Sequence, residues 1–514
     1  MTDLELPAGE RPVVVVGAGP AGLTAAYELS RAGIPGVVLE KDAVVGGISR
    51  TVLYRGYRFD IGGHRFFTKV AAVERLWREV LGDDLLLRPR LSRILYRGRY
   101  FDYPLKAWNV LRGLGLPYAT RALLSYAAAR VRPRRPERTL EDWVVNRFGE
   151  RLYRVFFKTY TEKVWGMPCS EIGADWAAQR IRGLSLSRAV AAALLPRRSH
   201  GIRTLVDAFH YPRLGPGQMW EAVRDRVTAA GLPVWTETEV VAIRHTGARA
   251  LGVDVAGRPG PRHLPASHVI SSMPVRELVE RLDPPAPARV LAAARALRYR
   301  DFLAVALIVD RAHLFPDNWI YVHDPGVRVG RIQNFGNWSP DLVPDPRTSC
   351  LGMEYFCFEG DPLWRLPDAE LLALARGEAV KLGIVPEGSV TDGAVVRMPK
   401  AYPVYDAGYG TNLGVLRAHL SSLANVHPVG RNGLHRYNNQ DHSMFTAMLA
   451  VRNILGERHD VWAVNADCEY HEEAGGPGAR PPADARTPSG RVPAPPVAPA
   501  DATRVETSEE TLRR

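Results

Sequence analysis

Cysteine is scarce in this sequence: Cys169, Cys350, Cys357 and Cys468 are the only four in 514 residues. No two of them form a CxxC pair, and none stands with histidines at the spacing of a zinc site. The pattern therefore predicts no metal site, and it is typical of a protein kept in a reducing cytosol.

Long apolar runs are missing as well. No stretch reaches the length needed to span a membrane. The first residues, MTDLELPAGERP, are polar and acidic, and they lack the basic and apolar regions of a signal peptide. We therefore expect a soluble cytoplasmic protein without a transmembrane segment.

Negative charge is outnumbered, because the formal net charge is +12. The arginines that carry the excess are spread along the whole chain, whereas nucleic-acid-binding proteins gather them on one face. Hydrophobic residues make up 46% and charged residues 24% of the chain, as in ordinary globular proteins. We interpret the positive charge as a compositional bias, so nucleic acid is not the expected partner. The expected partner is a small-molecule substrate, and the excess of arginine would favour an anionic one.

The strongest local pattern is a βαβ unit close to the N-terminus. Residues 13–16 are four valines and predict a buried strand, residues 21–31 have helical periodicity, and residues 37–39 predict a second strand. A chain of this length also has room for two or more lobes. The unit predicts an α/β fold with a dinucleotide-binding domain.

The turn inside this unit matches GxGxxG, the glycine pattern that binds the pyrophosphate of a dinucleotide. Gly17 permits the tight turn, Gly19 lets a pyrophosphate approach the backbone, and Gly22 lets the helix pack on the strand. The helix that follows offers free N–H groups and the positive end of its dipole to the phosphates. The GxGxxG pattern comprises Gly17, Ala18, Gly19, Pro20, Ala21 and Gly22.

A carboxylate follows the second predicted strand, at the position where a dinucleotide-binding domain binds ribose hydroxyls. Glu40 follows the second predicted strand, about twenty residues after the glycines, which is the position that accepts hydrogen bonds from ribose hydroxyls. Gly46, Gly47 and Arg50 come next, and this second glycine pair is not part of the plain NAD pattern.

The stretch from 57 to 69 reads YRFDIGGHRFFTK and is too rich in glycine for a helix interior. Gly62 and Gly63 give a bare backbone, and His64 adds an imidazole. Phe66 and Phe67 are expected to support the core. Alone, the stretch predicts only a turn beside aromatic packing.

The rest of the chain gives coarser signals. A hairpin is predicted over residues 91–103, and a capping box at Thr139–Asp142 starts a helix. Residues 106–138 are rich in Leu, Ala and Arg and predict a covered helix with a solvated face, in preference to a membrane-contacting one. Further predicted elements are short strands over 233–272 and 301–358, an apolar helix over 443–456, and a disordered tail.

The motifs GAGPAGL, Glu40, GGISR and IGGHRFF occur in the order seen in FAD-dependent amine oxidases and protoporphyrinogen oxidases, and the chain resembles that superfamily. Four later stretches are similar to those of UDP-galactopyranose mutase-like flavoproteins. They are Tyr160–Gly166, Gly330–Ile332, Met353–Tyr355 and Gly430–Asp441. His435, Asn439 and Gln440 depart from the mutase pattern.

The resemblance implies a flavin cofactor, FAD, and a role for each matching residue. Arg50 would pair with the pyrophosphate, and Arg431 would contact the flavin or its pyrophosphate. His64 would lie beside the isoalloxazine ring, with Gly62 and Gly63 giving access. Asp441 leads into the last helix, whose N-terminus would stabilise charge on the reduced ring. The cofactor-binding set is Gly17, Gly19, Pro20, Ala21, Gly22, Glu40, Gly46, Gly47, Arg50, Gly62, Gly63, His64, Gly430, Arg431 and Asp441.

The same resemblance implies a substrate side, with His64 as the first catalytic candidate. Arg331 and Tyr437 would hold a diphosphate. Trp165 would stack on a flat part of the substrate, or it is a core aromatic. Lys400 would hold a water near flavin N5, or it is an exposed lysine.

The implied architecture is a Rossmann-type, glutathione-reductase-like FAD-binding domain with an inserted α+β substrate domain. Residues 1–70, 200–285 and 420–472 are assigned to the cofactor domain. Residues 71–199 and 286–419 form the substrate domain, and residues 473–514 form the tail.

Two chemistries stay open. The first is an oxidoreductase that passes hydride from a sugar, a sugar nucleotide or a related metabolite to flavin N5. The second is a redox-neutral mutase in which reduced FAD is the N5 nucleophile. The resemblance places either in polysaccharide or secondary-metabolite sugar chemistry. A flavin-bearing assembly protein without turnover is the third reading, and the many polar residues expected around the flavin disfavour it.

Overall fold

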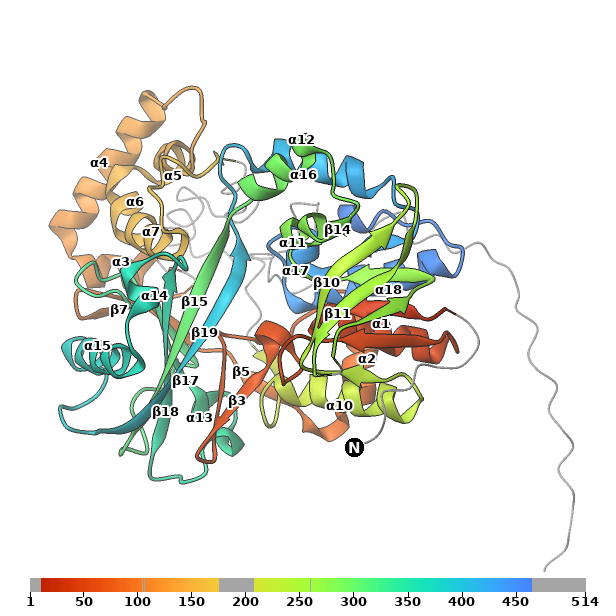
Figure 1. Ribbon diagram of the computed structural model, residues 1–514. Helices are drawn as coiled ribbons and strands as arrows, with labels where there is room; N and C mark the ends of the chain where they lie inside the picture. Colours follow the sequence, from red (N-terminus) through yellow and green to blue (C-terminus); the bar gives the residue numbers. More distant parts are fainter. Residues whose placement is uncertain (1–10, 104, 106, 175–207, 259, 465–514) are drawn as a thin grey trace, which may run out of the picture. The chain divides into compact units, whose positions relative to one another are not determined.

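The computed structural model describes residues 11–103, 105, 107–174, 208–258 and 260–464 (Figure 1). These residues belong to one compact unit, Met1–Ala474. The boundaries expected between a cofactor domain and a substrate domain stay a prediction, and the expected tail at 473–514 lies outside the described residues.

The predicted βαβ unit is present and forms the centre of a five-stranded parallel sheet. Strand β1 runs in register with β2 on one side and with β13 on the other, so Val15 lies between Val38 and Ile270. The order across the sheet is β20 (Val426–Pro428), β13 (His268–Ser271), β1 (Val13–Val16), β2 (Gly36–Leu39), β9 (Val234–Trp235).

Successive strand residues point to opposite sides of the sheet, and both faces are covered by other elements. Val13 and Val15 pack against helices, and Val14 and Val16 pack in a second core with a smaller sheet. The helices are α1 (Pro20–Arg31), α2 (Ala71–Leu81), α10 (Gly217–Ala229) and α18 (Gln440–Ile454). The smaller sheet is β12 (Arg262–Pro265), β11 (Ala250–Gly257), β10 (Thr238–His245) and β14 (Leu282–Asp283), with α11 (Val275–Glu280), α12 (Ala288–Ala296) and α16 (Tyr409–Leu420) nearby.

A seven-stranded mixed sheet forms the other large element. Its inner strand β15 is buried along all its residues, which explains the unbroken apolar run FLAVALIV. The order is β19 (Val390–Pro403), β15 (Tyr299–Val309), β18 (Ser349–Cys357), β17 (Arg331–Asn334), β16 (Trp319–Val322), β6 (Ser92–Tyr96), β7 (Arg99–Asp102). Helix α15 (Asp368–Lys381) packs on this sheet. The strands predicted over 301–358 are thus confirmed, and so is the hairpin β6–β7, with Arg97 and Gly98 at positive φ in its turn.

Two short strand pairs connect these parts. Strand β3 (Thr51–Tyr54) pairs with β4 (Tyr57–Asp60), and β5 (Leu85–Pro89) pairs with β8 (Ala208–Pro212). The glycine-rich stretch after β4 is a loop, as predicted. Phe66 in that loop is buried and stacks on Trp77 at 3.9 Å between ring centres, so its expected core role is confirmed.

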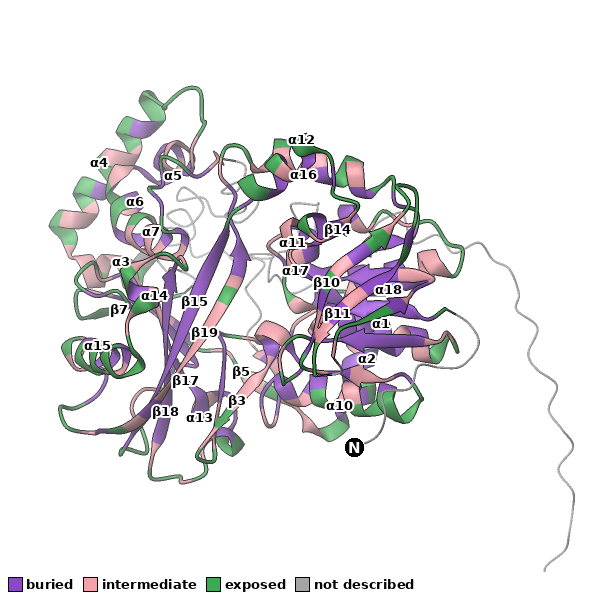
Figure 2. Cartoon of the chain, viewed as in Figure 1, coloured by how far each residue is buried: buried purple, intermediate pink, exposed green. Residues whose placement is uncertain are grey.

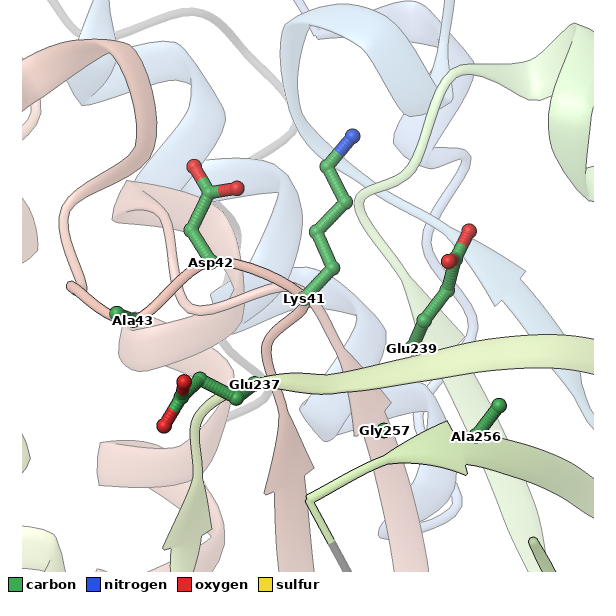
Figure 3. A pocket seen from close by; sticks show the side chains of 7 residues that line it. All are labelled: Lys41, Asp42, Ala43, Glu237, Glu239, Ala256 and Gly257. Carbon is green, nitrogen blue, oxygen red and sulfur yellow. The ribbon is translucent and has the colours of Figure 1, made fainter. Parts of the chain in front are cut away.

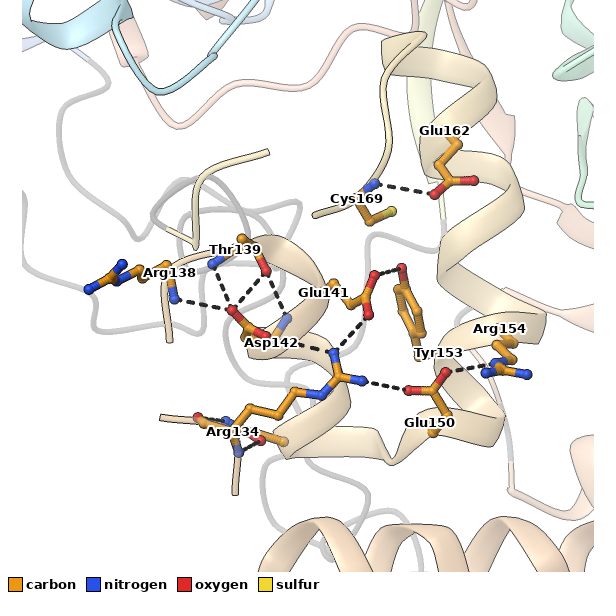
Figure 4. Close-up of polar contacts among 11 residues, drawn as sticks. Arg134, Arg138, Thr139, Glu141, Asp142, Glu150, Tyr153, Arg154, Glu162 and Cys169 are labelled. Carbon is orange, nitrogen blue, oxygen red and sulfur yellow. Dashed lines mark hydrogen bonds and ion pairs between the residues drawn. The ribbon is translucent and has the colours of Figure 1, made fainter. Parts of the chain in front are cut away.

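A group of helices follows the hairpin: α3 (Ala107–Leu114), α4 (Leu116–Val131), α5 (Leu140–Phe148), α6 (Glu150–Tyr153) and α7 (Thr159–Trp165). The predicted capping box is present, because Thr139 accepts from the Asp142 amide while Asp142 accepts from the Thr139 amide. Figure 4 shows how Arg134 then joins Glu141 to Glu150 across this group. Residues 175–207 lie outside the described residues.

Burial along α4 differs from the expectation of a covered helix with a solvated polar face. Figure 2 shows this helix largely in the colours of exposed and intermediate residues. Only Ala122 and Ala129 of α4 are buried, whereas Leu116, Leu124 and Val131 are exposed. The helix therefore turns small residues to the protein and large apolar residues outward.

Candidate functional site

Three glycine positions build the loop between β1 and α1. Gly17 has φ +94°, and a Cβ there would lie 2.3 Å from Ser272 Oγ. A Cβ on Gly22 would lie 1.7 Å from the Gly17 carbonyl oxygen. Both positions therefore need glycine for the fold alone. Gly19 differs, since the nearest atom to a Cβ there is 3.8 Å away; its missing side chain leaves room for something else.

The second glycine pair lies directly against the first. The Gly46 amide donates to the Ala18 carbonyl at 2.8 Å, and a Cβ on Gly47 would lie 3.3 Å from Gly19 Cα. Residues 47–49 form the short 3₁₀ helix η1. Two loops separated by about thirty residues thus meet backbone to backbone.

A third segment from near the C-terminus joins them. Gly430 begins the short helix α17 (Gly430–Gly433), has φ +78°, and a Cβ there would lie 2.9 Å from Ala21 Cβ. Its amide donates to Thr446 Oγ1 of α18 at 2.9 Å. The C-terminal motif therefore packs on the first turn of α1, beside Pro20, which opens that helix.

Glu40 lies at the end of β2, as predicted, and is buried. Its carboxylate accepts from the Ala18 amide at 2.7 Å and from the Asp42 amide at 2.9 Å. Burial raises its pKa above the usual value, while these two amides act in the opposite direction. Arg50 Nη1 lies 2.7 Å from Asp42 Oδ2, so in this structure its partner is a carboxylate. Its expected pairing with a pyrophosphate stays a prediction.

These features fit a bound dinucleotide. No side chain caps the first turn of α1, so the N–H groups at its start have no side-chain acceptor. The surface beside them is backbone of Gly19 and Gly47, which lets a phosphate come close. Glu40 follows directly after the last residue of β2, and two backbone amides fix its carboxylate.

A surface pocket of about 460 Å³ opens beside this region (Figure 3). Asp42, Glu237 and Glu239 line it together with Lys41. Each of these carboxylates is ion-paired with an arginine, Asp42 with Arg50, Glu237 with Arg258 and Glu239 with Arg281, so the arginine charge beside the pocket is already compensated. The pocket therefore does not extend the phosphate-binding surface.

His64 follows the glycine pair after β4 and is half-buried. Gly62 has φ +99°, and the nearest atoms to a Cβ there belong to His64 and Phe302; Gly63 lies against Trp338. His64 Nδ1 is buried without a hydrogen-bond partner among the described residues. Burial, with the positive charges of Arg431 and Arg331, lowers the pKa of His64 to about 3, so its imidazole is neutral.

Arg331 lies on β17 directly opposite Glu354 on β18, and the two side chains form an ion pair. Gln333 also donates to the Glu354 carboxylate. Burial opposes charge on Arg331, but Glu354 and nearby tyrosines raise its pKa well above the usual value. Arg331 Nη2 also donates to the Tyr402 hydroxyl at 3.2 Å.

Tyr437 lies in the same cluster. Its ring stacks on Tyr402 with centres 5.4 Å apart, and the Arg431 guanidinium lies 5.1 Å from its ring centre. The Arg431 guanidinium also donates to the carbonyls of Asn438 and Ala401. The structure thus brings His64, Arg331, Arg431 and Tyr437 together, and their roles towards a flavin or a substrate stay predictions.

Trp165 is 4% exposed and packs in a core cluster that includes Met167 and Val404. Its ring centre lies 6.1 Å from that of Tyr437. The packing favours the alternative of a core aromatic that supports Tyr437, and stacking on a substrate stays a prediction.

Lys400 has φ +55° and is held on three sides. Its Nζ lies 2.5 Å from Glu277 Oε1, its amide donates to Asp301 Oδ1, and its carbonyl accepts from Asn432 Nδ2. The lysine is therefore neither a freely exposed side chain nor, in this structure, a partner of the His64 cluster.

Asp441 lies in the first turn of α18 and is 1% exposed. Its Oδ1 lies 3.1 Å from His442 Nδ1. An acid in the first turn suits the positive end of a helix dipole. Its predicted place near a flavin stays untested.

The sequence reading missed two arginines beside this cluster. Arg65 and Arg90 both face the ring of Trp319, with guanidinium carbons 5.2 and 5.5 Å from its centre. Arg90 Nε and Nη2 are buried without a hydrogen-bond partner among the described residues. Burial and the charge of Arg90 lower the pKa of Arg65 to about 10. Tyr402 was also missed, although it lies only two residues after Lys400.

Other site types find no support in the part of the chain that the structure describes. No three His, Cys, Asp or Glu side chains gather as a metal site there. Cys169, Cys350 and Cys357 are buried free thiols. Among the same residues, no helix has both the length and the apolarity to cross a membrane.

Two curated proteins are similar in sequence to parts of this chain. A probable UDP-galactopyranose mutase from Klebsiella pneumoniae is 28% identical over 175 residues, which are 32% of this chain and 43% of that protein. A phytoene dehydrogenase from Streptomyces griseus is 26% identical over 290 residues, 50% of this chain and 53% of that protein. The chain thus spans about half or less of the length of these curated relatives.

Solved structures match over more of the chain. A reduced UDP-galactopyranose mutase superposes with a TM-score of 0.77 and 21% identity, covering 90% of this chain and 97% of the other. A putative protoporphyrinogen oxidase from Exiguobacterium gives a TM-score of 0.66 at 18% identity, covering 88% and 100%. At such identities these likenesses establish the fold.

The family itself follows from a match that covers most of the chain. The model of the flavin containing amine oxidoreductases matches residues 20–399, a range that includes the helix of the glycine loop, His64, Arg331 and Glu354. This chain belongs to the flavin containing amine oxidoreductase family.

Proposed function

We propose that this protein is an FAD-dependent oxidoreductase that takes hydride from a small anionic substrate, a sugar nucleotide or related sugar derivative. The observation that carries the proposal is the convergence of His64, Arg331 and Arg431, since the charges of both arginines act on the His64 imidazole. These residues come from three distant segments, and Arg431 follows Gly430, which packs on the first turn of α1.

The cofactor side is assigned to backbone. The start of α1 with Gly19 and Gly47 would hold the pyrophosphate, and Glu40 would receive ribose hydroxyls. When bound, FAD supplies a hydride acceptor at N5. Gly62 and Gly63 carry no side chain, so their backbone beside His64 would be accessible to the flavin.

The protein's own charges suit a reaction in which negative charge grows in the site. His64 is neutral, so the positive charge in the site comes from Arg431 and, partly compensated by Glu354, from Arg331. Preorganised charges of this kind stabilise a developing anion because they need no reorientation during the reaction. Burial by Phe302 and Trp338 next to the glycines would exclude water.

Arg90 and Arg65 would provide most of the positive charge that binds the negatively charged group of the substrate. Arg331 already faces Glu354, so its charge is largely compensated. Arg90 is different, because two of its buried nitrogens have no acceptor. A phosphate group would give those nitrogens acceptors, and the stacked rings of Tyr402 and Tyr437 would form a flat wall.

A redox-neutral sugar-nucleotide mutase is the second candidate. It is favoured by the meeting of Arg331, Glu354, Arg431 and Tyr437, which lie in the stretches that are similar to mutase motifs. His435 weighs against it: it stands where those motifs have a tyrosine, it is buried, and its Nε2 lies 3.3 Å from the Val404 carbonyl oxygen.

An anaerobic titration separates the two candidates. Nucleoside diphosphate sugars, beginning with UDP-galactopyranose, would be added to the oxidised holoprotein while the flavin absorbance is followed. Bleaching of the oxidised band by one of them supports the oxidoreductase. Isomerisation that appears only after chemical prereduction, with no electrons consumed, identifies the mutase, and a protein that takes up no flavin contradicts both.

A further inference from the structure

Helix α4 presents an apolar stripe to solvent. Leu116, Leu123, Leu124 and Val131 are 71%, 47%, 68% and 79% exposed. At about 100° per residue, their spacing places all four within an arc of about 100° on the helix. Monomer surfaces rarely carry contiguous large apolar side chains without a binding role.

The opposite side of α4 accounts for its attachment to the protein. Ala122 and Ala129 are its buried residues, and they lie about 150° and 170° from the centre of the stripe. Small residues allow close packing, and α4 contacts α3, α5 and α6. The leucines are therefore not needed to hold the helix in place.

The segment that carries the stripe has charge of one sign only. Between residues 105 and 136 the sequence contains no aspartate or glutamate, while lysine and arginine recur. On α4, Arg121 and Arg130 project about 60° and 20° beyond the two edges of the stripe. No carboxylate within the described ranges lies at ion-pair distance from Arg112, Arg121 or Arg130, unlike Arg134, which pairs with Glu141 and Glu150.

We propose that α4 docks this protein peripherally on an anionic lipid bilayer. Its leucine stripe would enter the boundary between headgroups and acyl chains, and its arginines would meet lipid phosphates. Trp108 on the neighbouring helix α3 is 67% exposed, and tryptophan is the side chain most at home at that depth. The chain would lie on the membrane without crossing it.

The charge pattern favours lipid over a second copy of this chain. A two-fold dimer through the stripe would place each basic edge near the same edge of its partner. Like charges at a closing interface oppose association, whereas a sheet of anionic headgroups matches all of them at once.

The test is co-sedimentation of the full-length flavoprotein with vesicles of phosphatidylcholine alone and of phosphatidylcholine mixed with phosphatidylglycerol. Wild-type protein should pellet with the mixed vesicles at low salt and be released at high salt. The double variant Leu123→Ser, Leu124→Ser should partition about tenfold less. Arg121→Gln with Arg130→Gln should lower binding to the anionic vesicles only.

The matched control is Leu87→Ser with Leu455→Ser, two leucines that are 65% and 57% exposed outside α4. It should bind vesicles as the wild type does. Flavin absorbance and thermal unfolding verify that each variant is folded. Failure of wild-type protein to bind anionic vesicles overturns the proposal, and so does equal binding by the stripe variant. A wild-type dimer that the stripe variant dissolves, without any vesicle binding, assigns the stripe to a second copy instead.

Discussion

Arg331 on β17 and Glu354 on β18 form an ion pair directly across two antiparallel strands. Glu354 is 1% exposed, so the pair is held where water does not screen it. This contact keeps Arg331 charged and at the same time reduces the field it offers to a ligand.

Removing the carboxylate should therefore act on stability and on binding in opposite directions. Glu354→Ala leaves Arg331 without its partner, and breaking such a buried pair costs about 3–5 kcal/mol of unfolding free energy. Glu354→Gln keeps the shape and should cost less, while pyrophosphate should bind several-fold tighter to the freed guanidinium. Urea unfolding and calorimetric titration measure the two effects. Unchanged pyrophosphate affinity in Glu354→Gln would show that Arg331 does not face the ligand.

Substitution of the glycines in the phosphate loop should have two different effects, loss of flavin binding at Gly19 and loss of folding at Gly22. Gly19→Val adds a side chain where only Gly47 Cα is near, so the fold should survive while flavin is lost. Gly22→Ala places a Cβ 1.7 Å from the Gly17 carbonyl oxygen and should impair folding itself. Flavin absorbance per protein and the melting temperature of the flavin-free form distinguish them. A yellow Gly19→Val protein would refute the placement of the pyrophosphate.

His64 should not titrate near neutral pH. Burial and the charges of Arg431 and Arg331 lower its pKa to about 3, so the native imidazole is neutral above about pH 4. An unfolded chain takes up that proton near pH 6.5, so His64 makes stability fall as the pH drops from about 6.5 toward 3. His64→Gln should change the rate of flavin reduction but leave its pH profile between 5 and 8 unaltered. A step near pH 6.5 in the wild type that vanishes in the variant would contradict this.

Asp60 gives the opposite pH dependence. Burial raises its pKa to about 7, although Tyr211 and Thr51 donate to its carboxylate. The native state therefore holds a proton that the unfolded chain releases near pH 4, and stability falls as the pH rises from about 4 to 7. Relative to Asp60→Asn, the wild type should lose about 4 kcal/mol by pH 8. Urea unfolding of both proteins across this range is the check, and parallel curves would show that Asp60 ionises normally.

The sequence made some parts of this site predictable because their causes are local. Gly22 is required by the Gly17 carbonyl oxygen five residues earlier, Gly17 adopts a positive φ in a tight turn, and Glu40 follows directly from the strand before it. Arg65 and Arg90 were not predictable in this way. Their meeting at Trp319 depends on the pairing of β6 with β16, which joins residues more than two hundred positions apart.

Helix α4 shows a second limit. The 3.6-residue period reveals an apolar stripe, but it does not say which side the protein covers. Alanines supply enough surface for packing on α5 and α6, so the leucines point outward. Trp165 is the reverse case, since its motif pointed to a ligand while tertiary packing buries it.

The most direct test of the account is the anaerobic reduction of the bound flavin by one sugar substrate in its nucleoside diphosphate form and as the free sugar. With the proposed FAD bound, the cationic pair Arg65 and Arg90 predicts that the phosphorylated form bleaches the oxidised band at concentrations at least about tenfold lower. Arg90→Gln should erase most of that difference without loss of flavin, and Arg347→Gln, an exposed arginine beside Asp345, should not. Equal saturation by both forms in the wild type would contradict an anionic substrate at this site.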